Sequence, residues 1–268
     1  MQQVREQFDE GVLLPRIPGP SGEPPSVDDV KALTRAGRRV HAAGAVLNFA
    51  ATGAAVAFLL RNRRVAGDNW LLPVAGAAVG TYAADLASGI LHWTFDTWFD
   101  DSVEPVKRMV YIVREHHMRP ARIFRYRVRD EAGLLSWFGL GIATPFYYFA
   151  QSGRAGVSPV RYASAVAGVT VATQVTFMLE WHKWGHRARR GRLPRLLQRS
   201  YVLLSPEFHL RHHSGNHDEN YCLINGLADR TLGRMGLFRV LEQTITRLVG
   251  ARPRRNDREW ALRYGRPR

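Results

Sequence analysis

Four apolar runs dominate the hydrophobic pattern of this chain of 268 residues, and they cover residues 41–60, 70–99, 134–150 and 158–181. A helix of about 20 apolar residues spans a hydrocarbon core of roughly 30 Å, so the first run has the length of a membrane crossing. The second run is longer, and we expect its end to project beyond the bilayer. The third is short enough to be a buried core helix, but four runs in succession favour membrane spans. The pattern predicts an all-α protein built on an integral membrane four-helix bundle.

Polar segments flank these runs. Residues 1–38 hold five prolines and lack the apolar core of a signal peptide, which predicts a flexible polar arm. Residues 39–250 then form one membrane-embedded domain, and residues 251–268 a basic tail. Apolar residues at helical spacing beside arginines predict that residues 193–204 form either a helix in the headgroup region or a solvated loop followed by a short core helix. Leu237 to Val249 reads as an amphipathic helix.

The chain is strongly basic, with 38 Lys and Arg against 23 Asp and Glu and a net charge of +15. Such a balance indicates an anionic partner, which is a nucleic acid or a membrane surface. Four apolar runs favour the membrane and argue against nucleic acid. With four spans, the cationic segments 1–40, 100–133 and 182–268 share one side, so the positive-inside rule predicts that both termini and the middle loop are cytoplasmic. Arg61, Arg63 and Arg64 oppose that rule locally.

Nine of the ten histidines fall on this predicted cytoplasmic side. They are His92, His116, His117, His182, His186, His209, His212, His213 and His217. The i, i+4 spacing of His182 and His186 places both imidazoles on one helix face, and His209, His212 and His213 follow a similar spacing. Cys222 is the single cysteine, so histidines must supply most of any metal site. We therefore expect a cytoplasmic helical cap that carries a histidine-rich site.

Neutral imidazole is the commonest nitrogen ligand for iron, zinc and copper. A zinc ion takes about four ligands, so nine clustered histidines are too many for one such ion. Two metal ions that share eight or nine imidazoles fit the count. Two irons held by nitrogen ligands can bind dioxygen and oxidise an unactivated C–H bond. At a membrane face, such a pair is within reach of a lipid chain, so the pattern favours a di-iron centre with O2 as co-substrate.

Two aspartates interrupt the second apolar run, where a charge is costly and usually functional. Asp85 precedes His92 by two helical turns, and Asp96 follows it by four residues. Because a ligating histidine usually donates its other N–H to a carboxylate or carbonyl, both are candidates for orienting His92. Asp96 is the stronger candidate, as an orienting carboxylate, an occasional ligand or a catalytic group. The alternative is an aspartate that simply lies at the membrane interface.

Four ordered motifs resemble the Kua-type lipid desaturase family, from about Tyr82 to Asp257. They are Asp85-Leu-Ala-Ser-Gly-Ile-Leu-His92-Trp-Thr-Phe-Asp96-Thr-Trp98, Arg114-Glu-His-His117, His182-Lys-Trp-Gly-His186 and His209-Leu-Arg-His-His213. The resemblance implies a membrane-embedded enzyme with a di-iron centre. Its expected ligands are His92, His116, His117, His182, His186, His209, His212 and His213. In the ether-lipid branch of the family His217 also has a counterpart, which makes it a ninth ligand or an outer group. Phe208 departs from that branch, where a second histidine often precedes His209.

That branch implies a specific reaction. It is the O2-dependent introduction of a vinyl-ether double bond into the 1-O-alkyl chain of plasmanyl phospholipids, a step of plasmalogen biosynthesis. The sequence shows no flavin or haem motif, so an external electron donor of the ferredoxin or cytochrome type is implied. Two alternatives stay open: an acyl-lipid desaturase or hydroxylase with the same metals, and a non-enzymatic membrane metal-binding protein.

Overall fold

The computed structural model describes residues 33–67, 69–99, 106–153, 156–187, 191–214 and 217–254. Every regular element in these ranges is helical, which confirms the all-α prediction. The chain forms two compact units. One, which we call the apolar-helix unit, comprises residues 33–88 and 127–181; the other, the histidine unit, contains residues 89–126 and the chain from His182 onward.

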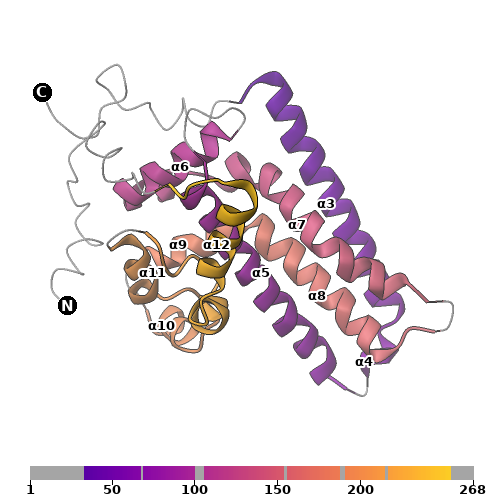
Figure 1. The fold of residues 1–268 in the computed structure, drawn as a ribbon. Helices are drawn as coiled ribbons and strands as arrows, with labels where there is room; N and C mark the ends of the chain where they lie inside the picture. The colour runs from indigo at the N-terminus through magenta and orange to yellow at the C-terminus, as the bar shows by residue number, and fades with distance from the viewer. Residues whose placement is uncertain are drawn as a thin grey trace, which may run out of the picture. The chain divides into compact units, whose positions relative to one another are not determined.

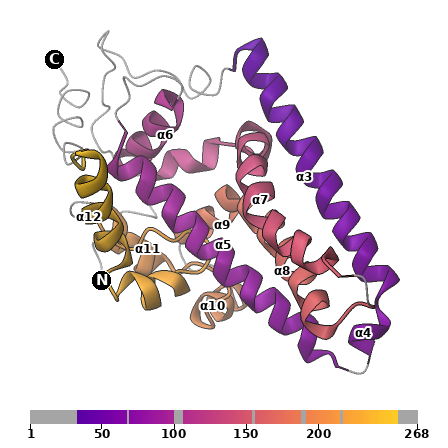
Figure 2. The ribbon, with the colours of Figure 1, turned by 45° about the vertical axis from the view of Figure 1, so that its right-hand side comes forward.

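Long apolar helices build the apolar-helix unit. They are α3 (Arg35–Arg61), the first part of α5 (Leu71–Thr97), α7 (Val128–Gln151) and α8 (Pro159–Thr176), with the short α4 (Arg64–Gly67) after α3. α3, α7 and α8 lie side by side in both ribbon views (Figures 1 and 2). The small residues of the sequence let α5 approach α8: a Cβ added at Gly76 or at Gly80 would lie 2.5 Å from a backbone oxygen of α8. Such close contact between backbones is typical of helices that associate in membranes.

Two helices of the described chain, α3 and α5, are long and apolar enough to cross a membrane. They cover the first two predicted spans. α8 and α9 (Met178–Gly185) together form a third candidate, bent by 67° at their junction, which covers the predicted run 158–181. α7 covers the predicted third span but is not among these candidates. Its first turn carries Asp130 and Glu131, and glycine, serine, threonine and tyrosine dilute its apolar content. By length and composition, two or three of the four predicted spans are thus candidates for crossing a membrane.

Short helices build the histidine unit. They are α6 (Lys107–Met118), the 3-10 turn η1 (Pro120–Arg125), the end of α9, α10 (Arg192–Arg199), α11 (Pro206–His213), the π-helical turn η2 (Asp229–Gly233) and α12 (Leu237–Val249). The last residues of α5, from Gly89, also belong to this unit. α11 starts where its sequence predicts, because Pro206 occupies its first turn and the Ser205 side chain accepts a hydrogen bond from the Phe208 N–H.

α10 exposes its apolar side. Leu193 and Leu196 are 64% and 62% exposed, whereas the one buried residue of the helix is Gln198. The helices of soluble proteins turn their apolar stripe towards the core. An outward apolar face beside Arg192, Arg195 and Arg199 is instead typical of a helix that lies in a headgroup layer, the first of the two alternatives for this segment.

The two predicted ends of the chain are described only in part. Residues 1–32 of the predicted arm and residues 255–268 of the predicted tail lie outside the described residues. α3 begins at Arg35, inside the range predicted as the arm. The first residues of the predicted tail are fixed to the end of α5, because the Arg254 N–H donates to the Thr97 carbonyl (2.6 Å) and its guanidinium to the Phe95 carbonyl (2.7 Å).

Candidate metal centre

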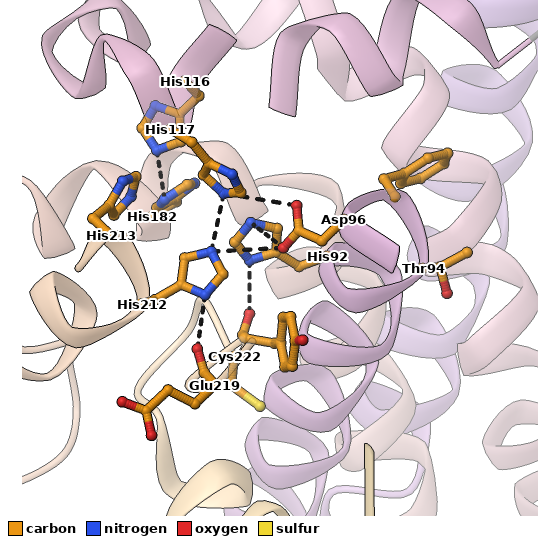
Figure 3. A network of polar contacts seen from close by, with 12 residues as sticks. His92, Thr94, Asp96, His116, His117, His182, His212, His213, Glu219 and Cys222 are labelled. Carbon is orange, nitrogen blue, oxygen red and sulfur yellow. Dashed lines mark hydrogen bonds and ion pairs between the residues drawn. The ribbon is translucent and has the colours of Figure 1, made fainter. Parts of the chain in front are cut away.

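Four helical segments bring metal-ligating side chains together within the histidine unit. The end of α5 supplies His92 and Asp96, and α6 supplies two histidines in its last turn. α9 and the residue that follows it supply two, and α11 supplies three. These side chains form two groups. The five-histidine group consists of His116, His182, His186, His209 and His213. The aspartate group consists of His92, Asp96, His117 and His212. Figure 3 shows the aspartate group with its neighbours.

Helix geometry divides the histidines between the two groups. Pairs four residues apart share a group: His182 with His186, and His209 with His213. Adjacent residues are separated, so that His116 and His117 join different groups, and the same holds for the two neighbours at the end of α11. Residues four apart lie on one helix face, whereas neighbours differ by about 100° around the axis. The paired histidines of the motifs therefore contribute to two groups, each of which could hold a metal ion.

The five-histidine group is assembled around converging Nε2 atoms. The Nε2 atom of His182 lies 3.2 Å from that of His116, 3.1 Å from that of His186 and 2.8 Å from that of His209. One ring nitrogen carries either one proton or one lone pair, so it cannot form three hydrogen bonds of this kind at once. Lone pairs that point at a common centre explain the contacts better. This is the arrangement that a bound cation requires.

The distances also bear on the coordination number. Two nitrogens bound at about 2.1 Å are about 3.0 Å apart at right angles and about 3.4 Å apart in a tetrahedron. The three contacts of His182 Nε2, 2.8–3.2 Å, are close to the first value, and the five donor atoms all lie within 4.8 Å of one another. Five donors at this spacing suit a metal with five or six ligands, such as iron, better than a four-coordinate zinc. The side chains of the group thus fit the predicted iron.

The aspartate group combines three imidazoles with one carboxylate. Asp96 Oδ2 lies 3.5 Å from His92 Nε2 and 3.6 Å from His212 Nε2, and its Oδ1 lies 3.7 Å from His117 Nε2. The side chains of this group are all at least nine-tenths buried. A buried carboxylate facing three Nε2 atoms is an anionic ligand for a cation that they would share. Asp96 is 5% exposed, so its carboxylate is enclosed by protein and is not open to solvent.

Backbone carbonyls orient two rings of the aspartate group. His92 Nδ1 lies 3.0 Å from the Tyr221 carbonyl, and His212 Nδ1 lies 2.7 Å from the Glu219 carbonyl (Figure 3). A carbonyl only accepts, so each Nδ1 carries the proton and donates it. Each Nε2 is then unprotonated and directs its lone pair at the other members of the group.

Burial keeps the histidines neutral. It lowers the pKa of the imidazoles well below 6.5, and the charges that neighbouring histidines would carry lower it further. This holds for His116, His117, His186, His209, His212 and His213. Neutral imidazole is the form that binds metal, so the site is ready for a cation at neutral pH.

Three residues that the sequence singled out, His217, Asp85 and Phe208, lie outside both groups. Among the described residues, neither group includes His217, whose ring instead stacks on that of His117 with 4.1 Å between centroids. This favours an outer position over a ninth ligand. Asp85 is fully buried and belongs to the apolar-helix unit, so its predicted role stays a prediction. The Phe208 ring packs under the Arg230 guanidinium, 4.1 Å away, while His209 joins the five-histidine group.

Sequence reasoning missed the contribution of the segment from Glu219 to Cys222. Its carbonyls leave no trace in a pattern of side chains. The one available signal was the apolar run of residues 221–224 after a polar turn, and residues 221–226 are indeed all buried. The Asp229 carboxylate, which accepts a hydrogen bond from the Cys222 N–H at 2.7 Å, was missed for the same reason.

The comparisons with known proteins agree with the site. Residues 81–256, which include all nine members of the two groups, match the family described as a lipid desaturase domain. The chain belongs to this lipid desaturase family. The resemblance inferred from the four motifs is thereby confirmed, and the protein is an oxidoreductase that desaturates lipids.

Individual relatives cover most of the family region. The chain is 28% identical to the plasmanylethanolamine desaturase of Myxococcus xanthus over 214 residues, which are 80% of this chain and 74% of that protein. It is 30% identical to plasmanylethanolamine desaturase 1 of Mus musculus over 197 residues, 71% of each chain. It is 28% identical to the chloroplastic fatty acid desaturase 4-like 2 of Arabidopsis thaliana over 193 residues, 69% of this chain and 64% of that protein. No solved structure matches the chain.

Proposed function

We propose that this lipid desaturase forms the vinyl-ether double bond of plasmalogens. Its substrate would be the 1-O-alkyl chain of a plasmanyl phospholipid, and the double bond would form next to the ether oxygen. The observation that carries the proposal is the pair of adjacent buried metal-ligating groups in a chain of this family. The choice of an ether lipid is supported by the similarity to two relatives named for that substrate.

The reaction needs an oxidant and two external electrons. Two hydrogens leave the alkyl chain, and dioxygen takes them up together with two protons and two electrons to give two molecules of water. Two irons, when bound, would supply the activation of dioxygen and the removal of hydrogen. Among the described residues, the five-histidine group would hold one iron and the aspartate group the other.

The chain's own residues have three tasks in this scheme. Eight neutral imidazoles bind without adding charge, so Asp96 alone supplies an anion to the two groups. The Asp96 carboxylate would bind the iron that it shares with His92, His117 and His212, and hold their three Nε2 atoms at a fixed distance. Burial of the ligands would exclude water, which would otherwise compete with the lipid chain for the oxidant.

We further propose that residues 39–250 form a membrane-embedded domain with four spans. Both termini and the metal centre would be cytoplasmic, as the distribution of cations favours. His92 and Asp96 lie in the last turns of α5, one of the candidate spans, which supports a route for the lipid chain from the bilayer. The outward leucines of α10 support a second attachment, in the headgroup layer.

The electron donor would be a small acidic redox protein of the ferredoxin or cytochrome type. The net charge of +15 supports such a partner, because opposite charges steer association. The chemistry of the reaction, which needs two external electrons, also supports this partner.

The decisive experiment supplies an alkyl-ether lipid to cells that express the chain and measures acid-labile vinyl ethers by mass spectrometry. We expect vinyl ethers in the wild type and none in a His182→Ala strain. If purified protein with bound iron and a working reductant forms no vinyl ether, the ether-lipid proposal is wrong. A double bond or hydroxyl group in an acyl chain would then identify the second candidate, which the similarity to a relative named as a fatty acid desaturase favours.

A further inference from the structure

The segment from Glu219 to Tyr221 presents two backbone carbonyls to the aspartate group. The Glu219 carbonyl accepts from His212 Nδ1 at 2.7 Å, and the Tyr221 carbonyl accepts from His92 Nδ1 at 3.0 Å. The two rings come from different helices, α11 and α5, yet their centroids are 4.4 Å apart. One short stretch of backbone thus sets the tautomer and the orientation of two of the four ligating side chains.

Asn220, the residue between the two carbonyls, has a backbone conformation that few side chains tolerate. Its φ is 58°, in the left-handed region. A Cβ atom disfavours this region for most residues; asparagine enters it more readily than the others, glycine freely, and a β-branched residue hardly at all. The direction of the peptide units on both sides of Asn220 depends on this conformation. A residue that left it would turn at least one carbonyl away from its histidine.

Residues 219–221 cannot easily shift to compensate for a changed conformation at position 220. The next residue, Cys222, is fully buried, and its N–H donates to the buried Asp229 carboxylate at 2.7 Å. Cys222 also lies directly on α5, where a Cβ added at Gly89 would come within 2.5 Å of its sulfur. Tyr221 packs on Phe238 of α12, with 4.8 Å between ring centroids. Contacts after Asn220 therefore fix the segment in place.

We propose that residues 219–221 act as a backbone clamp for the metal in the aspartate group, and that Asn220 is a positioning residue because it holds the left-handed conformation between the two carbonyls. The inference rests on the proposed metal centre but not on the proposed substrate. Asn220 acts through His92 and His212. Its role predicts a loss of metal affinity at one of the two groups, and the five-histidine group should keep its metal.

The test compares four forms of the purified full chain: wild type, Asn220→Gly, Asn220→Ala and Asn220→Val. Metal-free protein is titrated with Fe2+ under anaerobic conditions, and iron content and Mössbauer spectra are recorded. We expect the Asn220→Gly protein to bind Fe2+ as the wild type does, the Asn220→Ala protein to bind it more weakly and the Asn220→Val protein to bind it most weakly. Loss of an orienting partner lowers metal affinity about 10- to 100-fold. In the Asn220→Val protein we expect this loss for the iron of the aspartate group and not for the other iron. Asn62→Val, at the end of α3 where φ is −104°, is the matched control and should bind both irons normally.

Two results would overturn the clamp. One is Asn220→Val protein that binds both irons as tightly as the wild type. The other is Asn220→Gly protein that loses iron as severely as the valine variant, because the side chain and not the backbone conformation would then matter. If the Asn220→Val protein does not fold, iron binding by the Asn220→Ala protein, which carries the milder change, tests the clamp instead. A wild type that desaturates no ether lipid, but whose variants follow the expected order of Fe2+ binding, would refute the proposed function and support the clamp.

Discussion

At the scale of single residues, the position of a histidine within its helical turn decides which of the two groups it joins. His212 and His213 are neighbours on α11, yet the first belongs to the aspartate group and the second to the five-histidine group. The sequence presents them as one motif. Because neighbouring side chains on a helix point in directions about 100° apart, one motif supplies two sites.

This separation leads to a first prediction. His212→Ala and His213→Ala should each remove about one iron of two and lower desaturation by more than about 100-fold, beyond the effect typical of an orienting partner. The iron that remains should differ between the variants, with mainly nitrogen ligands in His212→Ala and a carboxylate ligand in His213→Ala. Mössbauer spectra distinguish these environments. His41→Ala, in the apolar-helix unit, should keep both irons, and identical spectra for the two variants would contradict the separation.

Burial of the histidines leads to a second prediction, on pH. Burial lowers the pKa values of these imidazoles well below 6.5 in the folded protein. Below pH 6.5 the histidines of the unfolded chain therefore bind protons, whereas the same histidines stay neutral in the folded protein. The stability of the metal-free protein is therefore retained above pH 6.5 and lost as the pH falls. We expect a loss of about 1 kcal/mol at pH 5.5 for each histidine that stays neutral. Thermal unfolding of the metal-free protein in detergent at pH 7.5 and 5.5 measures this; an equal or higher midpoint at pH 5.5 would refute it.

At the scale of elements, α10 is the helix whose environment differs most from that of a soluble protein. Its Leu193 and Leu196 point outward, whereas its Gln198 is buried. The sequence pattern was compatible with a headgroup helix or with a loop and a core helix. The exposure of Leu193 and Leu196 favours the first, since a core helix would bury these side chains.

A third prediction follows for α10. A fluorescent label on Leu196→Cys should be quenched by spin labels on lipid acyl chains, whereas a label on Arg195→Cys should be quenched less. The two positions differ by about 100° around the helix axis, and the arginine side should stay at the headgroups. The native Cys222 is fully buried and should not react. Equal quenching at both positions, or none in anionic vesicles, would show that α10 does not lie in the bilayer surface.

At the scale of the whole molecule, the metals would hold the histidine unit together. Its candidate ligands come from α5 and α6 in one part of the sequence and from α9, the residue after it and α11 in another. Without cations, many buried imidazole nitrogens would face one another. A ligand that binds only the folded state stabilises that state by RT ln(1 + L/Kd), where L is the concentration of free ligand.

The fourth prediction concerns metal removal. Treatment with an iron chelator should lower the thermal midpoint of the protein by several degrees, because binding at about 100 times the dissociation constant contributes about 2.7 kcal/mol. Readdition of Fe2+ under anaerobic conditions should restore the midpoint. Asp96→Ala protein, which lacks the one anionic ligand, should show a smaller shift than the wild type. A midpoint that does not respond to metal would contradict a structural role for the ions.

Parts of the fold could be predicted from local pattern alone. The bounds of α5 and the end of α3 follow from their apolar runs, whereas α3 begins six residues before its run. The start of α11 agrees with its serine cap and proline. α7 was harder, because its composition lies between that of a span and that of a buried helix. Composition does not determine whether lipid or protein covers such a helix.

The sequence by itself determined which residues are candidates for metal ligands, because side-chain chemistry and helical spacing are local properties. It identified all eight imidazoles of the two groups, and it indicated Asp96 beside them. Only the tertiary structure decided how these side chains divide, that His217 stacks on His117 outside both groups, and that the Glu219 and Tyr221 carbonyls orient two rings. The stacking of His217 on His117 and the contact of His92 with Tyr221 join segments at least 100 residues apart. The carbonyls are backbone atoms, which are identical in every residue, so no pattern of side chains records either kind of contact.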